Sequence, residues 1–334
     1  MKAIVQDRYG STEVLELSEV DTPVAGDNEV LVRIHAAAVN AYDWHVMRGD
    51  PYLARVMAPA VFGFGGPKKK IRGRDFAGRV EAVGRNVTQF GPGDDVYGDL
   101  GDTNGAFAEY VCVPAAAVQP KPANLTFEQA AAVPLAGNTA LMGLRDVGRV
   151  QPGQQVLVNG ASGGVGTFAV QIAKSFGAEV TGVCSAKNAD LIASIGADHV
   201  IDYTKDDFTR NGLHYDVVFD LVGNRSLAEF RRALTPEGTL ILSGGGESNG
   251  GSLVGPMRLM LRGQLVSRFV RHRLLLLTAA PSTDNLATLS KLLESGKLAP
   301  VIDRTYPLSE VPEAIRYLEV EHARAKVIIT VIER

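Results

Sequence analysis

The feature that most constrains the fold is a strand, a glycine loop and a helix in immediate succession. Residues 156–166 read VLVNGASGGVG, and the helix-like segment TFAVQIAKSFG follows. Gly160, Gly163 and Gly166 are spaced by three, which suits a backbone that approaches a diphosphate closely. Free N–H groups at the start of the following helix favour an anion. The pattern predicts a dinucleotide site, the alternative being a tight structural turn.

The chain changes character along its length. Residues 1–122 contain short runs rich in Val and Ile, separated by Gly, Pro, Asp and Asn, which predict a mostly β part. From residue 123 an Ala- and Leu-rich helical stretch leads into alternating strand-like and helix-like segments, ending with LLLLTA at 274–279. Six such strands in about 160 residues predict one doubly wound parallel sheet with helices on both faces.

The last part of the chain predicts a return to the first. After residue 281, leucines repeat at helical spacing up to Gly296, and a strand-like run, KVIITV, lies near the end. We therefore expect an α/β protein of two domains. One is a discontinuous β-rich domain made of residues 1–122 and 281–334. The other is a dinucleotide-binding domain made of residues 123–280.

Composition narrows the possible functions. The chain has 334 residues, of which 46% are hydrophobic and 21% charged, and its net charge is −3, so we expect no nucleic-acid partner. The first residues lack the apolar core of a signal peptide, and no run reaches the ~18 apolar residues of a membrane span. Two cysteines cannot form a disulfide framework. These features together favour a cytoplasmic protein.

The segment after the second strand of the expected sheet indicates which dinucleotide binds. An NAD site carries Asp or Glu about 20 residues past the glycine loop, bonded to the ribose 2′-hydroxyl. From Val180 to Ala189 this chain has no carboxylate and instead offers Ser185 and Lys187. A 2′-phosphate needs cations and hydroxyl donors, so the sequence favours NADPH over NADH. The alternative for Lys187 is an ordinary solvated surface lysine.

Several motifs together resemble one family. They are GASGGVGTFAVQIAK (160–174), GADHVIDY (196–203), GRDFAGRVEAVG (73–84), GDDVYG (93–98), VNAYDWHVMRG (39–49) and HARAKVIITV (322–331). The chain resembles the zinc-independent medium-chain dehydrogenase/reductases of the quinone oxidoreductase and ζ-crystallin group, especially the reticulon-interacting and chloroplast-envelope branches. The resemblance implies a GroES-like first domain, a Rossmann second domain and a homodimer that pairs the strands at 274–279. It also implies NADPH-dependent reduction of quinones or of C=C bonds conjugated to a carbonyl.

Departures from the zinc-dependent members of that family indicate a site without a metal. The metal-binding GHE triplet is replaced by Gly73-Arg74-Asp75, and two cysteines are too few for a structural zinc lobe. Ala41 stands where the family usually has proline, and Ala325 where it usually has glycine. We therefore expect no metal ion at the site.

Chemistry without a metal favours reduction over alcohol oxidation. An alcohol dehydrogenase must stabilise an alkoxide, which zinc does as a Lewis acid, and no YxxxK pair stands where it would replace the metal. A quinone or an enone spreads the charge left by hydride addition over a conjugated oxygen. The predicted function is NADPH-dependent reduction of a small apolar quinone or α,β-unsaturated carbonyl. The alternatives are a metal-free NADP-dependent alcohol or aldehyde oxidoreductase and a non-catalytic NADPH-binding protein.

The candidate catalytic residues lie in one turn after the strand VRIHAAAV. By resemblance this turn faces the nicotinamide, and Asn40 is similar to a residue near the cofactor's ribose. Tyr42 is placed to donate a hydrogen bond to the substrate carbonyl, and Asp43 completes the candidate set. The alternative is that Asn40 and Asp43 only close the turn through bonds to the backbone.

The candidate cofactor residues are more widely spread. The glycine loop serves the diphosphate, the turn after the second strand serves the 2′-phosphate, and the carboxyl ends of the fourth and fifth strands add contacts. Thr139, Tyr203 and Lys326 are assigned by resemblance to the nicotinamide, the adenine and the cofactor side of the site, with surface placement as the alternative for Lys326. The set is Thr139, Gly160, Ser162, Gly163, Gly164, Val165, Gly166, Ser185, Lys187, Tyr203, Val222, Gly223, Ser243, Gly244, Gly245 and Lys326.

A basic stretch at residues 256–273 is the least ordinary part of the sequence. Its apolar side chains and its arginines fall on different helical faces, which is typical of a helix that lies on an anionic membrane. The apolar face is short for that role. We therefore favour one of two other roles, a lid that covers the substrate cleft or a packing surface between subunits. Membrane contact is the less favoured alternative.

Overall fold

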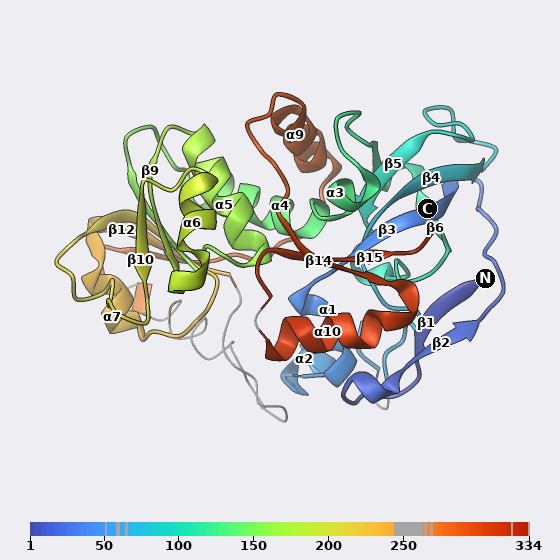
Figure 1. Cartoon of the computed structure of the whole chain (residues 1–334), viewed down its shortest axis with the longest axis horizontal. Helices are drawn as coiled ribbons and strands as arrows, with labels where there is room; N and C mark the ends of the chain where they lie inside the picture. The colour runs from blue at the N-terminus through green and yellow to red at the C-terminus, as the bar shows by residue number, and fades with distance from the viewer. Residues whose placement is uncertain are drawn as a thin grey trace.

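Two sheets carry most of the structure, and Figure 1 shows them on the left and right of the molecule. The computed structural model describes residues 1–50, 52–57, 61–63, 66–243, 263, 266–267, 270–321 and 323–332. The candidate residues Gly244 and Gly245 and most of the basic stretch 256–273 lie outside these ranges. No helix among the described residues is long and apolar enough to cross a bilayer.

One sheet is parallel throughout and has the order β10-β9-β8-β11-β12-β13. Its strands are β8 (Gln155–Asn159), β9 (Glu179–Cys184), β10 (His199–Asp202), β11 (Tyr215–Asp220), β12 (Leu234–Leu242) and β13 (Arg273–Leu276). The chain order reverses between β8 and β11, as in doubly wound nucleotide-binding folds, where ligands bind at the carboxyl ends beside the reversal. The predicted Rossmann sheet is confirmed.

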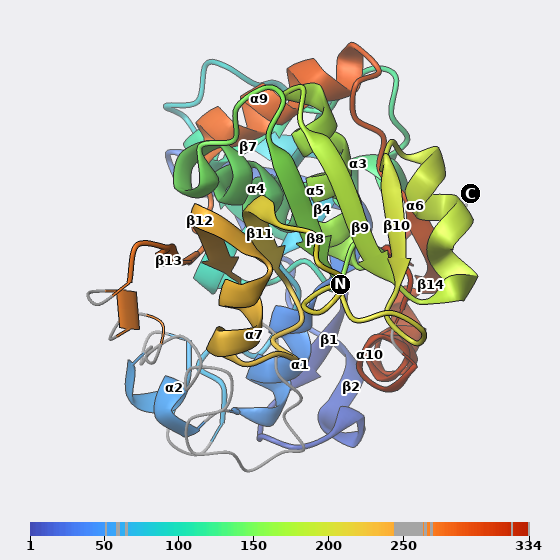
Figure 2. The same ribbon diagram turned by 90° about the vertical axis from the view of Figure 1, so that its left-hand side faces the viewer.

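Both faces of this sheet are buried, which explains the unbroken apolar runs in its strands. Val156 and Val158 of β8 pack into one core with Phe168, whereas Leu157 packs into another with Phe230. Figure 2 shows helices in front of and behind the strands. They are α4 (Pro134–Leu141), which continues as a π-helical turn (Met142–Gly148), α5 (Gly164–Ser175), α6 (Ala189–Ser194) and α7 (Leu227–Arg232).

The other sheet is mixed and combines distant parts of the chain. Its order is β14-β15-β3-β4-β5-β7, with β6 paired to β3. Its strands are β3 (Glu29–Val39), β4 (Asp75–Val83), β5 (Asp95–Asp99), β6 (Tyr110–Pro114), β7 (Val118–Pro120), β14 (Ile302–Pro307) and β15 (Lys326–Thr330). β15 lies antiparallel to β3, with Val327 opposite Val39. The start of β15 therefore lies beside the candidate catalytic turn.

Helices and a hairpin complete the fold around the mixed sheet. They are β1 (Lys2–Gln6), β2 (Leu15–Glu19), α1 (Ala41–Arg48), α2 (Tyr52–Met57), α3 (Phe127–Ala131), α9 (Thr283–Glu294) and α10 (Val311–Val320). α9 is the helix predicted from leucine spacing. Ser282 caps it by accepting a hydrogen bond from Asn285 N–H at 3.2 Å, and Gly296 follows it with a φ of +70°.

The glycine loop touches the mixed sheet directly. Gly163 forms a bridge with Ala325, whose N–H donates to Ser162 O at 2.7 Å. Ala325 has a φ of +63°, in the left-handed region that favours glycine. This conformation explains why glycine is the residue that the family usually has there. The division of the chain at residues 123 and 281 stays a prediction.

Candidate functional site

The glycine loop forms an open backbone cradle at the end of β8. Gly160 has a φ of +87°, and Gly163 N–H donates to Gly160 O at 3.0 Å, which closes the turn. α5 starts at Gly164, and no side chain in the described ranges caps its first N–H groups. Among the described residues, a Cβ on Gly163 would meet only Gly160 O, at 3.4 Å, whereas a Cβ on Gly166 would lie 2.7 Å from the Ala161 carbonyl carbon. The cradle is open on one side and tight against the sheet on the other, which fits a bound diphosphate.

Three predicted cofactor residues come together at the carboxyl ends of β9 and β10. Ser185 follows β9 directly, and Lys187 is exposed two residues later. Tyr203 follows β10, is 53% exposed, and its N–H donates to Cys184 O at 3.1 Å. The turn after β9 thus presents a hydroxyl and a cation, and the exposed phenol ring of Tyr203 stands beside them. This arrangement fits a phosphorylated ribose and an adenine ring.

Asp202 adds a carboxylate that the sequence window after β9 did not include. Its register partner across the sheet is Cys184. Hydrogen bonds from Thr204, at 2.8 Å from Oγ1 and 3.1 Å from N, lower the pKa of Asp202. Its Oδ2 accepts no hydrogen bond from the described residues, and the Lys205 ammonium lies 3.9 Å away. This end of the site therefore combines cations with one carboxylate.

A buried carboxylate holds the turn after β11 against the cradle. Asp220 accepts hydrogen bonds from Val222 N–H at 3.3 Å and Gly223 N–H at 3.1 Å, and burial raises its pKa. A Cβ on Gly160 would lie 2.8 Å from Val222 Cγ2. Ser243 N–H donates to Asp220 O at 3.0 Å. The structure thus brings Val222, Gly223 and Ser243 to the same edge of the sheet as the glycine loop.

Three buried side chains join the candidate catalytic turn to the last strand. Lys326 Nζ donates to Asn40 Oδ1 at 2.5 Å and lies 3.6 Å from Asp75 Oδ2. Asn40 Nδ2 donates to the same carboxylate oxygen at 3.1 Å, and Leu135 N–H donates to the other oxygen, also at 3.1 Å. Lys326 is only 2% exposed, so the alternative of surface placement is wrong for this lysine.

Burial controls the protonation of this cluster. It raises the pKa of Asp75, against the opposing charge of Lys326, and it lowers the pKa of Lys326. Asp43 accepts the Asn40 N–H at 2.8 Å, and burial raises the pKa of Asp43 to about 6. Both carboxyl groups therefore hold their protons more strongly than an exposed aspartate does.

Lys326 also touches the cradle. A Cβ on Gly164 would lie 3.1 Å from Lys326 Cδ. Ala325, the residue before Lys326, donates its N–H to Ser162 O. The partly exposed residues of the loop at this contact are Ser162, Gly163, Gly164 and Val165. The cradle, Lys326 and Asn40 therefore form one continuous site where the two sheets meet.

Two predicted residues lie at the edges of this site. Tyr42 is half-buried in the first turn of α1 and packs with Val61 and Phe62. Thr139 is buried in α4, and its hydroxyl donates to Leu135 O at 2.7 Å. The Thr139 hydroxyl therefore forms its hydrogen bond within its own helix. The backbone N–H of Leu135, in turn, donates to Asp75.

Sequence reasoning missed several polar residues that the fold places here. Arg74 makes two hydrogen bonds to Asp99, at 2.9 and 2.8 Å, and the pair is buried. Asn104 is buried with a φ of +55°. Arg72 is 1% exposed, and its guanidinium makes no hydrogen bond within the described ranges. One sequence pattern could have revealed this cluster. Arg72 and Arg74 come immediately before the apolar strand β4, and Asp75 is the first residue of that strand.

The structure offers no ready set of metal ligands in the part that it describes. No group of three or more His, Cys, Asp or Glu side chains is arranged there to hold a metal ion. Cys112 and Cys184 are free, and burial raises the pKa of each thiol to about 11. The expected absence of a metal stays a prediction.

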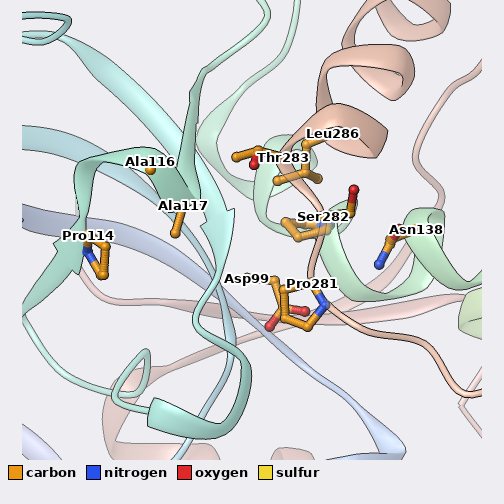
Figure 3. Close-up of a pocket in the computed structure, with 10 residues that line it drawn as sticks. Asp99, Pro114, Ala116, Ala117, Asn138, Pro281, Ser282, Thr283 and Leu286 are labelled. Carbon is orange, nitrogen blue, oxygen red and sulfur yellow. The ribbon is translucent and has the colours of Figure 1, made fainter.

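A separate cavity of about 190 Å³ lies between the start of α9 and the strands β5–β7. Figure 3 shows Asp99, Pro281 and Asn138 among the residues around it. Its lining is mostly apolar and includes none of the residues predicted to bind cofactor or substrate. The cavity is therefore distinct from the continuous site of the cradle, Lys326 and Asn40.

Family models match two parts of the chain. Residues 26–123 match the alcohol dehydrogenase GroES-like domain, and residues 195–329 match a family described as zinc-binding dehydrogenase. The first match covers the β-rich part of the chain and confirms the predicted GroES-like fold.

Relatives match over nearly the whole chain. The mouse mitochondrial NAD(P)H oxidoreductase RTN4IP1 is 34% identical, covering 99% of this chain and 89% of the relative. The tomato 2-methylene-furan-3-one reductase is 36% identical, covering 98% and 79%. The Escherichia coli quinone oxidoreductase, solved in complex with NADPH, is 25% identical with a TM-score of 0.83, covering 99% and 100%. The chain therefore belongs to the quinone oxidoreductase family of medium-chain dehydrogenase/reductases.

Proposed function

We propose that this protein is an NADPH-dependent reductase that passes a hydride to a quinone or an α,β-unsaturated carbonyl. The observation that carries the proposal is the continuous site formed by the glycine cradle, Lys326 and Asn40. Because Lys326 touches both the cradle and the candidate catalytic turn, a single dinucleotide can contact both. The turn then holds the acceptor beside the reactive end of that dinucleotide.

The residues present fit NADPH. The uncapped N–H groups at the start of α5 would bind the diphosphate, and Ser185 and Lys187 would bind the 2′-phosphate. Tyr203 would cover the adenine, and Asn40 with Lys326 would position the ribose and nicotinamide end. When bound, the cofactor supplies the hydride. The protein's own part is to orient the two reactants and to exclude water between them.

Three relatives' names support the acceptor class and the cofactor. They describe a quinone oxidoreductase complexed with NADPH, a 2-methylene-furan-3-one reductase and an NAD(P)H oxidoreductase. A solved structure named as an NAD-dependent alcohol dehydrogenase, 31% identical with a TM-score of 0.85, favours alcohol oxidation as a second candidate. Both candidates use the same cradle, so the acceptor separates them.

An acceptor panel tests the proposal. NADPH and NADH oxidation would be measured with quinones, 2-alkenals, enones and simple ketones, and the reverse reaction with alcohols. We expect turnover with the conjugated acceptors and a preference for NADPH. Turnover confined to alcohols and simple ketones, or a strong preference for NADH, would contradict the proposal.

Charge reversal at Lys187 tests the 2′-phosphate assignment. Lys187→Glu removes the cation and adds an anion, so we expect the Kd for NADPH to rise about 10- to 100-fold and the Kd for NADH to stay within a few-fold. The matched control is Lys297→Glu, which makes the same charge change at an exposed residue after α9. Equal weakening by both variants would show that only net charge matters.

The proposal also covers the domain division, the oligomeric state and the cellular compartment. We propose the domain division 1–122 with 281–334 and 123–280, supported by the strands that form each sheet. We propose a homodimer, supported by the edge position of β13, whose outer side pairs with no strand in the described residues. We also propose a cytoplasmic location, from the sequence features given above. Light scattering tests the dimer, and cell fractionation tests the compartment, for which the mouse relative's name says mitochondrial.

A further inference from the structure

Within the described part of the chain, the Tyr42 hydroxyl accepts a hydrogen bond and donates none. Asn104 Nδ2 donates to Tyr42 Oη at 3.4 Å. Among the residues that the structure describes, no atom accepts the hydroxyl hydrogen of Tyr42 in return. The side chain is half-buried in the first turn of α1, two residues after Asn40. Its hydrogen is therefore available to a molecule bound beside this turn.

A fixed cation lies against the Tyr42 ring. The guanidinium carbon of Arg74 is 4.6 Å from the ring centroid. Asp99 holds two nitrogens of Arg74, at 2.9 and 2.8 Å, so the guanidinium is held in place over the ring. A cation over an aromatic face stabilises the phenolate more than the neutral phenol, because the phenolate carries a full negative charge.

Asn104 has an unusual backbone conformation, and its Nδ2 also donates to Asp102 O at 3.1 Å. Its φ of +55° with ψ of −176° is rare for any residue but glycine. The residue is 5% exposed, and its Oδ1 has no hydrogen-bond partner in the described ranges. The strained backbone places the amide N–H at the phenol oxygen. An N–H donor at that oxygen strengthens as negative charge develops there.

The surroundings of Tyr42 keep its phenol protonated at neutral pH, and they also stabilise the phenolate that forms when the proton leaves. Burial raises the pKa of Tyr42, so the phenol holds its proton at neutral pH. The Asn104 hydrogen bond and the charges of Arg74 and Arg72 act in the opposite direction, whereas Asp102 adds to the rise. A general acid needs both properties, a bound proton and a stabilised conjugate base.

We propose that Tyr42 is the acid that protonates the acceptor, and that Asn104 and Arg74 are its positioning residues. The inference rests on the proposed function. A hydride adds to the β-carbon of an enone, and the C=C electron pair moves to the carbonyl oxygen as an enolate. The Tyr42 O–H bond then breaks and its electron pair stays on Tyr42 as a tyrosinate. The proton bonds to the α-carbon through the enolate electron pair, and the C=O double bond forms again. Water returns a proton to the tyrosinate, so the enone gains two hydrogens in total.

The two acceptor classes depend on this acid to different degrees. Hydride addition to a quinone leaves the anion of an aromatic hydroquinone, which is a weak base and takes its proton from water. An enolate is a much stronger base and gains more from a positioned acid. Loss of the Tyr42 hydroxyl should therefore slow enone reduction far more than quinone reduction.

Tyr42→Phe tests the assignment. We expect kcat/KM for an enone to fall about 10²- to 10⁴-fold, kcat/KM for a quinone to fall less than about 10-fold, and the Kd for NADPH to stay unchanged. The matched control is Tyr9→Phe, because Tyr9 packs in the same apolar cluster while its hydroxyl donates to Gly63 O at 2.9 Å. That control should leave the enone-to-quinone ratio unchanged. Equal losses on both acceptors with Tyr42→Phe would overturn the proposal.

A second measurement does not depend on activity. With ¹³Cζ-labelled tyrosine, the Tyr42 resonance is the one that Tyr42→Phe removes. Asn104→Gly suits the positive φ and removes the amide with its hydrogen bonds to Tyr42 Oη and Asp102 O, so we expect a higher pKa of Tyr42 in that variant and a lower enone kcat. An unchanged Tyr42 titration would refute the role of Asn104. If the wild type reduces neither quinones nor enones, the proposed function fails as well. Reduction of quinones alone, or enone reduction that survives Tyr42→Phe, refutes only the assignment of the acid.

Discussion

Replacing Lys326 by methionine isolates the charge that joins the cradle to the candidate catalytic turn. Methionine keeps the unbranched stem but removes the Nζ that donates to Asn40 Oδ1 at 2.5 Å and lies 3.6 Å from Asp75 Oδ2. Asp75 keeps its hydrogen bonds from Asn40 Nδ2 and Leu135 N–H, both at 3.1 Å. The variant therefore removes one charge from a site whose other contacts are retained.

The size of the effect depends on whether Asp75 is ionised. If the carboxylate had to stay charged, loss of its buried partner would destabilise the fold by about 3–5 kcal/mol. Asp75 can instead take up a proton, because burial raises its pKa. That uptake costs about 1.4 kcal/mol for each pH unit above the folded pKa. We expect a loss of about 1 kcal/mol near pH 6, from the missing hydrogen bond to Asn40. The loss should rise toward the 3–5 kcal/mol limit at about pH 9.

The direction of the pH dependence follows from the protons bound in each state. A group whose folded pKa is raised gives stability that is present below its unfolded pKa and is lost as pH rises through its folded pKa. Lys326 lowers the folded pKa of Asp75, so this pKa is higher in Lys326→Met. The variant therefore continues to lose stability as the pH rises above the folded pKa that Asp75 has in the wild type, where the contribution of Asp75 to wild-type stability no longer changes. The lowered pKa of Lys326 also widens the stability difference between wild type and variant. It makes the wild type gain stability as the pH rises toward the unfolded pKa of lysine, and the variant lacks this gain.

Urea unfolding of the wild type and the variant at about pH 6, 7.5 and 9 measures this difference. The control is the double variant Lys326→Met with Asp75→Asn, in which neither group can ionise. Relative to that control, Lys326→Met should lose stability steadily as the pH rises. A stability difference between wild type and Lys326→Met that stays constant from pH 6 to 9 would refute the reasoning.

Further predictions concern backbone and charge. Gly166→Ala should destabilise by about 1–3 kcal/mol and weaken NADPH binding, since its Cβ would lie 2.7 Å from the Ala161 carbonyl carbon; unfolding and fluorescence titration test this. Arg149→Gly should raise Tm slightly, because exposed Arg149 has a φ of +53°. Asp43→Asn should remove a loss of stability of up to about 3 kcal/mol that the wild type shows as pH rises from about 4 through 6, the raised pKa of Asp43; denaturation across that range would detect it.

The fold could be predicted because its evidence is local. Glycine spacing, apolar runs and leucine spacing each operate within about 15 residues, and they gave the cradle, the parallel sheet and α9. Helix α9 shows this well, because its leucines, its Ser282 cap and the positive φ of Gly296 are all encoded side by side. The expectation of a GroES-like domain came instead from the resemblance of several motifs to one family.

The polar network of the site could not be predicted because its partners are distant in sequence. The bond between Lys326 and Asn40 spans 286 residues and exists only because β15 pairs with β3. Asp202 was missed for a similar reason, since it enters the turn after β9 through the lateral pairing of β10 with β9. Strand order and register decide such contacts, and a window of sequence after one strand does not contain them.

The balance of buried charge suits an acceptor that is already electron-poor. Lys326 lies against Asp75 and Arg74 is paired with Asp99, so neither cation brings an unmatched charge to a bound carbonyl oxygen. Stabilising an alkoxide calls for such a charge, as a Lewis acid supplies. A neutral phenol and an amide N–H are sufficient where the negative charge spreads over a conjugated oxygen. The pairing of Lys326 and Arg74 with carboxyl groups thus favours quinones and enones on grounds independent of the relatives' names.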